Sequence, residues 1–417
     1  MNRRLSVVFL ALALPLMAAS QPGCPGDAGP YECAKGAALT GFIQAAKGAT
    51  VTGKYIVVLK PGVPAFAPGA LGFAPNSFTT SSFGPRQRMI VGSLVAAQAK
   101  MLAADARVQF VQEETVKTIQ GFESTALDPA APTILWGLDR IDQRLPPLDD
   151  GYTASGTGEG VDVCIVDTGV DPNHPAIKPR LVAVHSAFGG DTADAHGHGT
   201  HVAATATDGR RYGVSAKTAL LGCRCLNADG SGTDSSVINC IDWCAEMQRQ
   251  RGRPMALNMS LGGPVSPALD AAVCRAVAQG VVVVVAAGNS AHSACDGSPS
   301  RVDLAFTIGA TDKPIRSSGG EVWWETRSDF SNYGKCVDLF APGRDVLSAR
   351  KGDTDDNDPV AYSGTSMASP HVCGAAALCL ERGEDAAACL VSNATKDALA
   401  PDRIGDGSPN LFLFAGQ

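Results

Sequence analysis

The sequence predicts an α/β protein, in which a small α+β module precedes a doubly wound and mainly parallel sheet. From about Trp136 to the C-terminus, short apolar stretches alternate with segments of helical periodicity, the pattern of parallel strands joined by helices. A separate strand–helix–strand pattern occupies residues 53–118. Glycine and polar residues follow several apolar stretches, and in such sheets the functional residues lie beyond the carboxyl ends of the strands.

The small module is defined by its periodicity. Residues 53–60 have the composition of a strand and end at a Pro-Gly pair, which terminates strands. Residues 63–87 are rich in Pro, Gly, Phe and Ser and predict a long loop. A helix is expected over 93–105 and an alternating strand over 107–118.

The larger body has buried strands with helices between them. Apolar runs predict strands over 161–169, 218–226, 255–263 and 281–289. Amphipathic patterns predict helices over 235–250 and 266–280. This part of the chain is long enough to bury one large core.

The N-terminal residues predict export. A basic start, an apolar run and small residues make 1–20 a secretory signal, and no later stretch is long and apolar enough to anchor the chain in a membrane. Residues 21–50 read as a linker, 51–119 as the small module and 120–417 as the main body, with an exposed connector over 120–133. We expect a secreted protein that acts as a monomer.

The 13 cysteines fit an oxidising compartment. Because 13 is odd, at least one thiol has no partner within the chain. Cys24 and Cys33 are expected to pair with each other, while Cys240 and Cys244 lie one turn apart on a predicted helix. The sequence leaves the other pairings open.

Charge is distributed unevenly. The net charge is −7, with an excess of Lys and Arg over 50–119 and an excess of Asp and Glu from residue 120 onward. An acidic body argues against nucleic acid as a partner and suits docking against the basic module of the same chain.

Three polar residues fall where the predicted sheet places function. Asp167 ends an apolar strand, His198 lies in "HGHGTHV" and Ser366 in "SGTSMASPHV". Taken singly, each has an ordinary structural explanation as a turn or a helix cap. Together they supply a nucleophile, a base and an orienting carboxylate, in the chain order that subtilisin shows.

Several sequence blocks carry a specific resemblance. "VDTGVDPNHP", "HGHGTHVAAT", "NMSLGG", "AAGN" and "SGTSMASPHV" resemble the signature blocks of subtilisin-like serine proteases, the subtilases. "WGLDRIDQR", "DFSNYGKCVDLFAPG" and "SPNLFLF" resemble the proteinase K branch, and aqualysin-like members most closely. The resemblance implies the subtilisin-like fold and hydrolysis of peptide bonds through an acyl-enzyme.

By this resemblance, Ser366 is the nucleophile, His198 the general acid and base, and Asp167 the carboxylate that orients the histidine. Asn289 in "AAGN" matches the side-chain donor of the oxyanion hole, and the Ser366 backbone N–H the second donor. His201 matches a structural position, and His196 lies in the preceding loop.

The resemblance also locates the peptide-binding segments. Two segments match the edges between which the family holds an extended substrate, and a third matches the wall of the S1 pocket; their residues are Gly230, Ser231 and Gly232, then Ser260, Leu261 and Gly262, then Ala286, Ala287 and Gly288. The small uncharged wall predicts broad cleavage after apolar or aromatic P1 residues. Asp234 stands where proteinase K relatives often have an aromatic residue near S4, which leaves the P4 preference open.

The small module resembles the subtilase inhibitor propeptide, a ferredoxin-like domain, in "GKYIVVLKPG" and "VQFVQEETV". The resemblance implies an intramolecular chaperone and inhibitor that makes the protein an autoprocessed zymogen. Cleavage is expected between about Thr118 and Ser124.

Calcium is the ion that the resemblance implies, without an organic cofactor. Two oxygen-rich sites suit such a hard cation, one formed by Asp338 with carbonyl groups near Asp303 and Ala305, the other by Asp139, Asp142 and Gln143. Cys295 and Cys336 match a disulfide of aqualysin-like enzymes. Cys164 is expected to be a buried free thiol.

Two other functions compete with a secreted serine endopeptidase acting on polypeptides. A catalytically silent binding protein of the same fold would not need all of Asp167, His198, Ser366 and Asn289. A zinc protein using the histidine cluster would need two histidines at helical spacing with an acidic residue, as zinc peptidases have. Neither fits the sequence as well.

Overall fold

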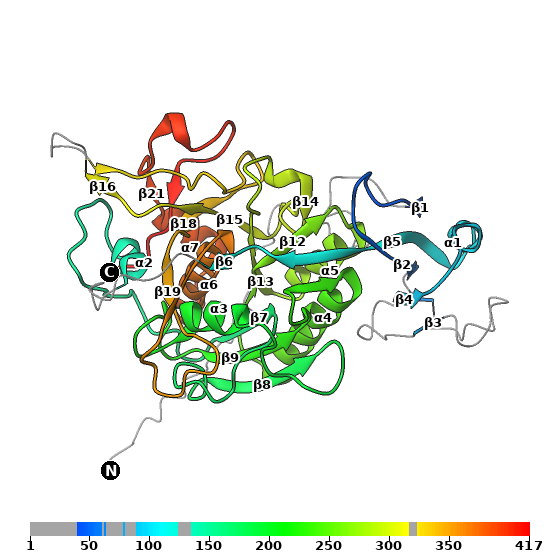
Figure 1. Cartoon of the computed structure of the whole chain (residues 1–417), viewed down its shortest axis with the longest axis horizontal. Helices are drawn as coiled ribbons and strands as arrows, with labels where there is room; N and C mark the ends of the chain where they lie inside the picture. Colours follow the sequence, from blue (N-terminus) through cyan, green and yellow to red (C-terminus); the bar gives the residue numbers. More distant parts are fainter. Residues whose placement is uncertain (1–39, 61, 64–77, 80–88, 124–134, 317–322) are drawn as a thin grey trace, which may run out of the picture.

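The computed structural model of the chain describes residues 40–60, 62–63, 78–79, 89–123, 135–316 and 323–417 (Figure 1). The expected signal segment and the expected Cys24–Cys33 pair lie outside these residues.

The larger body is built on a nine-stranded sheet. Its neighbouring strands pair in parallel except for β21 and β22, so the prediction of a doubly wound, mainly parallel sheet is confirmed. In spatial order the strands are β21 (Thr395–Lys396), β22 (Leu411–Phe412), β18 (Leu339–Pro342), β15 (Phe306–Thr311), β13 (Val281–Ala286), β11 (Met255–Met259), β7 (Asp162–Asp167), β9 (Ala219–Arg224) and β8 (Leu181–Ser186).

Helices cover both faces of this sheet (Figure 1). Along β7, Val163 and Ile165 belong to one apolar cluster and Cys164 and Val166 to the other, because successive side chains of a strand point to opposite faces. Helices α3 (His198–Thr207) and α6 (Thr365–Glu381) pack in the first cluster, α4 (Asp234–Arg251) and α5 (Pro267–Ala278) in the second.

Shorter elements complete the body. They are α2 (Trp136–Ile141), α7 (Ala386–Asn393), the antiparallel pair β16 (Ile315–Arg316) and β17 (Trp323–Trp324), the pair β19 (Val346–Ser348) and β20 (Val360–Ser363), β14 (Gly297–Ser298) and two 3₁₀ turns at Ala294–Asp296 and Pro401–Arg403.

The N-terminal module contains an antiparallel sheet. Strand β2 (Val51–Leu59) pairs with β4 (Met89–Gly92) on one side and β5 (Val108–Ile119) on the other, while helix α1 (Ala96–Ala103) contacts β5. A short strand, β3 (Phe78–Thr79), lies beside β4. Strand β1 (Gly41–Ile43) pairs in parallel with β5, so the expected linker over 21–50 contains a strand of this sheet.

Strand β5 joins the two parts of the molecule. It runs out of the module toward the middle of the larger body (Figure 1), where β10 (Ser231–Thr233) and β12 (Leu261–Pro264) pair with its C-terminal end. The single strand expected over 255–263 is therefore divided: its first part belongs to the parallel sheet, and its last part turns at Ser260 to face β5.

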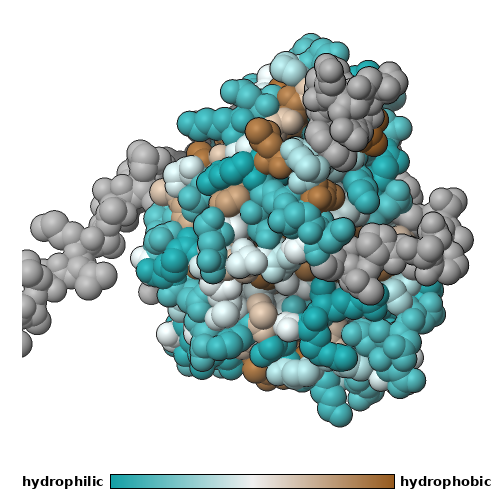
Figure 2. Space-filling view, turned by 90° about the vertical axis from the view of Figure 1, so that its left-hand side faces the viewer, coloured by the Kyte–Doolittle hydropathy of each residue, from teal (hydrophilic) through white to brown (hydrophobic). Residues whose placement is uncertain are grey.

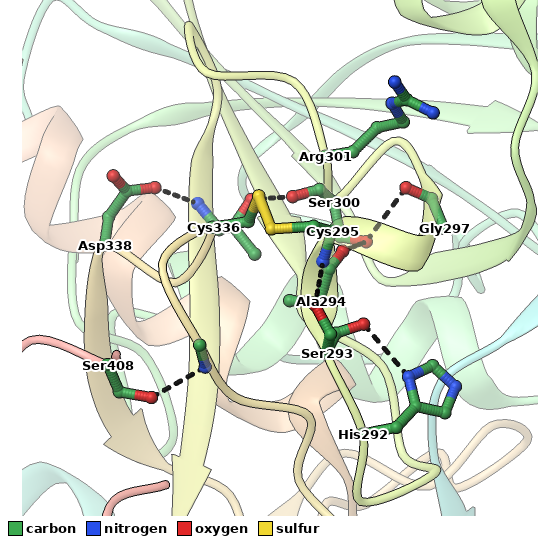
Figure 3. Close-up of a disulfide and its surroundings, with 12 residues drawn as sticks. His292, Ser293, Ala294, Cys295, Gly297, Ser300, Arg301, Cys336, Asp338 and Ser408 are labelled. Atoms are coloured by element: carbon green, nitrogen blue, oxygen red, sulfur yellow. Dashed lines mark hydrogen bonds between the residues drawn. A yellow bond between two sulfur atoms is a disulfide. The ribbon is translucent and has the colours of Figure 1, made fainter. Parts of the chain in front are cut away.

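Four disulfides lie in the described part of the chain. Cys295–Cys336 is formed as expected (Figure 3), and Cys379–Cys389 links α6 to α7. The expectation of a free thiol at Cys164 is wrong, since Cys164 is bonded to Cys244. Cys164 lies on the face of β7 that α4 covers. The other cysteine of α4, Cys240, lies one turn before Cys244 and is bonded to Cys223 of β9.

The face shown in Figure 2 is mainly hydrophilic, with described apolar residues in small separate groups. Within the described ranges, no helix is both long enough and apolar enough to cross a bilayer.

Candidate active site

Asp167 and His198 are brought together by neighbouring elements of the main sheet. Asp167 is the last residue of β7, and His198 is the first residue of α3. The His198 Nδ1 lies 2.8 Å from Asp167 Oδ1, and both side chains are fully buried. The carboxylate accepts a hydrogen bond from Nδ1–H, which leaves the lone pair of the neutral imidazole on Nε2. Among the described residues this Nε2 has no hydrogen-bond partner, and it is therefore free to accept a proton.

A second buried carboxylate, Asp194, shapes the loop before α3. It accepts hydrogen bonds from the His196 and Gly197 N–H groups at 2.9 and 2.8 Å, and from the Thr168 hydroxyl at 2.7 Å. The Thr168 hydroxyl in turn accepts the Gly199 N–H at 2.9 Å. These bonds connect the end of β7 to the start of α3, so they fix the distance between Asp167 and His198.

Ser366 lies in the first turn of α6, where the backbone N–H groups have no partner within the helix. Its N–H instead donates to the Gln120 carbonyl oxygen, at 3.0 Å. The Ser366 hydroxyl donates to the Ser260 carbonyl oxygen at 2.9 Å, so a rotation about the Cα–Cβ bond is needed to direct it to His198. Gly121 separates the two side chains: a Cβ on this residue would lie 3.0 Å from His198 Nε2 and 3.2 Å from Ser366 Cβ.

Asn289 lies on the other side of the Gln120 carbonyl group. Its Oδ1 accepts the Thr365 N–H and hydroxyl, both at 2.9 Å, which leaves its N–H₂ group for a different acceptor. A Cβ on Gly364 would lie 2.9 Å from Asn289 Nδ2 and 2.3 Å from the Gln120 oxygen, so the amide and the carbonyl oxygen approach the same point. Glycine is required there, both for this close approach and for its φ of 154°.

The other two histidines of the cluster have separate surroundings. His201 is buried, its Nε2 lies 2.9 Å from the Val346 carbonyl oxygen, and burial lowers its pKa to about 3. His196 is exposed. The cluster is therefore not a three-ligand metal site.

The end of β5 occupies the groove between the two expected peptide-binding edges. Thr118 is opposite Ser231 on one side and opposite Gly262 on the other, and Ile119 is opposite Leu261. The Ile119 N–H donates to the Gly230 carbonyl at 3.0 Å, and the Gln120 N–H to the Ser260 carbonyl at 3.2 Å. The chain is thus held as a third, antiparallel strand, which is how extended peptides are recognised by sheet edges.

The Gln120 side chain enters a cavity of about 290 Å³. A Cβ on Gly262 would lie 3.6 Å from this side chain, and a Cβ on Gly288 3.7 Å from its Oε1. The expected wall residues Ala286 and Ala287 also line the cavity. Asn332 orders that wall by donating to the Ala287 carbonyl and accepting the Ser290 N–H, both at 2.9 Å.

The chain continues along the groove beyond Gln120. Residues Phe122–Glu123 form β6, which pairs antiparallel with β20, three residues before Ser366. The expectation of an exposed connector starting at residue 120 is therefore wrong for its first residues, because their backbone groups find partners in the groove.

The N-terminal module also contacts the N-termini of two helices. Glu114 accepts the Ser235 N–H at the start of α4, at 3.3 Å, and Gln112 accepts the Ala268 N–H at the start of α5, at 2.9 Å. Such acceptors satisfy the free N–H groups of a helix start, and a carboxylate there is favoured by the helix dipole.

The Asp139, Asp142 and Gln143 cluster has the properties of a cation site. Asp142 Oδ1 and Gln143 Oε1 are buried, and neither has a hydrogen-bond partner among the described residues. Burial raises the pKa of Asp139 and of Asp142, and the Asp149 carboxylate raises both further. Unsatisfied buried oxygens and uncompensated carboxylates are the groups that Ca²⁺ binds, so these residues fit the ion.

The second expected calcium site, at Asp338, has fewer of the properties of a cation site. Asp338 follows the Cys295–Cys336 disulfide (Figure 3) and its Oδ2 accepts the Thr307 N–H at 2.8 Å. Burial, together with the nearby Asp303 carboxylate, raises its pKa to about 7. No described Lys or Arg forms an ion pair with either carboxylate. Ala305 lies two residues beyond Asp303, just before β15.

Three residues of the site were not found from the sequence. Asp194 is the first residue of "DAHGHGTH". In that block the sequence indicated only His198, the general base. Asn332 and Gln120 lie in segments with no periodic signal. Gln120 lies inside the range of about Thr118 to Ser124 where cleavage was expected, but no signal in the sequence singled it out.

Comparison with known proteins now identifies the family. Residues 158–407 match peptidase S8, the subtilase family, over more than half of the chain. The chain is a subtilase. It is 42% identical over 318 residues to an extracellular serine proteinase of Thermus sp. (strain Rt41A), covering 75% of this chain and 72% of that protein.

Other relatives of this subtilase belong to bacteria and fungi. Alkaline serine exoprotease A of Vibrio alginolyticus is 40% identical over 78% of this chain and 58% of its own length, and subtilisin-like protease 1 of Arthroderma gypseum is 38% identical over 76% and 62%. A solved structure, that of a cold adapted subtilisin-like serine proteinase, has a TM-score of 0.60 at 40% identity, covering 68% of this chain and 98% of that one. These findings confirm the expected proteinase K branch and a secreted serine endopeptidase.

Proposed function

We propose that this subtilase is made as a zymogen that cleaves its own Gln120–Gly121 bond through a catalytic triad of Ser366, His198 and Asp167. The observation that supports this best is the position of the Gln120 carbonyl oxygen, 3.0 Å from the Ser366 N–H. A carbonyl group held at a helix N-terminus, beside a serine and a buried His–Asp pair, is a peptide bond poised for attack.

The reaction follows from these contacts. The Ser366 hydroxyl turns from the Ser260 carbonyl toward His198, gives its proton to Nε2, and its oxygen bonds to the Gln120 carbonyl carbon. The resulting oxyanion is stabilised by the Ser366 N–H and the Asn289 amide, and a single such donor contributes about 10²–10³ in turnover, a figure measured on subtilisin. His198 then gives the proton to the Gly121 nitrogen as the C–N bond breaks.

The acyl-enzyme is released by water. The leaving Gly121 amine makes room for a water molecule next to His198. His198 accepts a proton from this water while the water oxygen attacks the ester carbon. The ester bond breaks, the proton returns to the Ser366 oxygen, and Gln120 becomes a C-terminal carboxylate. Asp167 stabilises the charged imidazole in both half-reactions.

In this proposal the N-terminal module is the inhibitor propeptide. Strand β5 fills the groove as a product would, and Glu114 and Gln112 attach the module to α4 and α5, so it blocks the site after cleavage until it is removed. For other polypeptides we propose broad P1 specificity for apolar and aromatic residues, because the wall of Ala286, Ala287 and Gly288 is small and uncharged.

The test combines two measurements on the secreted form. N-terminal sequencing is expected to give Gly121, and a fluorophosphonate probe is expected to label Ser366. A mature N-terminus other than Gly121 would contradict cleavage at Gln120–Gly121, and an unlabelled Ser366 would favour a catalytically silent protein.

We further propose that Ca²⁺ stabilises the mature enzyme at the Asp139, Asp142 and Gln143 site and at Asp338. Chelation by EDTA is expected to lower the melting temperature by several degrees, since saturating a site at 100 times its Kd stabilises by about 2.7 kcal/mol. Differential scanning calorimetry measures the shift. Asp142→Asn should reduce it, and the exposed Asp229→Asn serves as the control. An unchanged melting temperature in EDTA would exclude both sites.

A further inference from the structure

The position of Lys117 defines a pocket beside the cleaved bond. With Gln120 at P1, Lys117 is the P4 residue, and it lies opposite Gly232 of β10. Its side chain is fully buried. The stem of the side chain passes over Gly263, where a Cβ would lie 3.0 Å from Lys117 Cδ. The S4 pocket is therefore shaped around a long unbranched side chain.

The ammonium group of Lys117 lies beside three oxygen atoms. Its Nζ lies 2.8 Å from Asp234 Oδ1, 2.9 Å from the Pro264 carbonyl oxygen and 2.7 Å from the Thr115 hydroxyl. Two of its N–H groups donate hydrogen bonds, to Pro264 and Thr115, and its positive charge is paired with the Asp234 carboxylate. Two of the three partners, Asp234 and Pro264, belong to the enzyme body and remain for any other peptide.

Asp234 depends on the bound strand for all its partners. Within the described residues, its carboxylate accepts the Thr115 N–H at 2.7 Å and the Thr115 hydroxyl at 2.8 Å, besides Lys117 and a longer bond from Gln112 at 3.4 Å. Thr115, Lys117 and Gln112 all leave with the propeptide. Asp234 is fully buried while a strand occupies the groove, so a bound peptide that offers it no partner would leave a costly unpaired carboxylate.

A second carboxyl group increases the negative character of the pocket. Asp270 is buried, burial raises its pKa to about 7, and the charge of Lys117 acts on it in the opposite direction. Its one ion pair in the described chain is with Arg301, at 3.6 Å. An apolar P4 side chain would cover Asp234 without compensating its charge, whereas a lysine compensates it directly.

We propose that Asp234 makes S4 selective for lysine, so that the mature enzyme prefers polypeptides with lysine three residues before the residue whose carbonyl group is attacked. This proposal rests on the proposed function, because it takes Gln120–Gly121 as the cleaved bond. In the self-cleavage reaction, Lys117 is then the P4 residue of the substrate. Asp234 acts as a specificity-determining residue that touches the substrate but not the reacting atoms.

The experiment compares peptides that differ only at P4. Fluorogenic peptides ending in Thr-Ile-Gln at P3 to P1 are prepared with lysine, norleucine or glutamate at P4, and kcat/KM is measured on the mature wild-type enzyme. We expect lysine to exceed norleucine by about 10- to 100-fold, the range for hydrogen bonds to a charged group. Glutamate should be the poorest substrate, because it places a second carboxylate beside Asp234.

Two variants and fluorophosphonate labelling of Ser366 distinguish the possible outcomes. Asp234→Leu should reverse the lysine-to-norleucine preference, while Glu246→Gln, which removes a charge farther along the same helix, should retain it. Because Asp234 also holds the propeptide, a variant that fails to mature leaves the wild-type comparison as the deciding measurement. Equal kcat/KM for lysine and norleucine in an enzyme whose Ser366 reacts with fluorophosphonate overturns the S4 proposal alone. An enzyme whose Ser366 does not react overturns the proposed function.

Discussion

A chain with Ser366→Ala is expected to accumulate as an uncut precursor. The variant removes the hydroxyl of the residue whose N–H holds the Gln120 carbonyl oxygen, so the Gln120–Gly121 bond loses its proposed nucleophile. We expect autoprocessing to slow by roughly 10⁶-fold, the scale known for a subtilisin that loses this serine. Mass spectrometry of the purified protein measures the intact precursor, and the wild type should yield a fragment starting at Gly121.

The control for this variant is Ser392→Ala, an exposed serine on α7. It should mature and react with fluorophosphonate like the wild type. If purified Ser366→Ala still produced the Gly121 terminus by itself, another protease or another residue would be responsible, and autoprocessing by Ser366 would be refuted.

A chain with Asp167→Asn is expected to process itself about 10⁴-fold more slowly. The Asn amide can donate to His198 Nδ1, which forces the imidazole proton to Nε2 and removes the lone pair that accepts the Ser366 proton. Asparagine has nearly the same size and shape as aspartate, so the geometry of the site should be retained. A time course of precursor cleavage gives the rate.

Asp191→Asn is the matched control, since Asp191 is an exposed acid in the loop before His198. It should process at the wild-type rate. A similar loss in both variants would mean that the general acidity of this loop matters, and a wild-type rate for Asp167→Asn would exclude Asp167 from the reaction.

The parts of the fold that follow from local patterns were predictable. The apolar runs at β7, β9 and β13 were recognisable because both faces of these strands are buried, and Asp167 marks the end of the first. The triad candidates were found because specific sequence blocks surround them. The opposite charges of the N-terminal module and the main body also indicated that the two would dock against each other.

The remaining features depend on contacts between distant segments. Residues 255–263 read as one strand, but pairing with β5 turns Leu261–Pro264 out of the parallel sheet. Cys164 could not be paired from spacing alone, because its partner is 80 residues away on a helix whose packing decides the contact. The roles of Gln120 and Lys117 appear only when the register between β5 and the two groove edges is known.

The two disulfides of α4 have a consequence for how this subtilase distinguishes peptides. Cys164–Cys244 and Cys223–Cys240 fasten the helix to two adjacent strands of the main sheet, so its position does not depend on whether the groove is filled. Asp234 begins that helix and is therefore preorganised: the entropic cost of binding falls on the incoming peptide alone. Peptides that vary only at P4 should then differ in rate because of the chemistry of that one side chain, without a contribution from rearrangement of the enzyme.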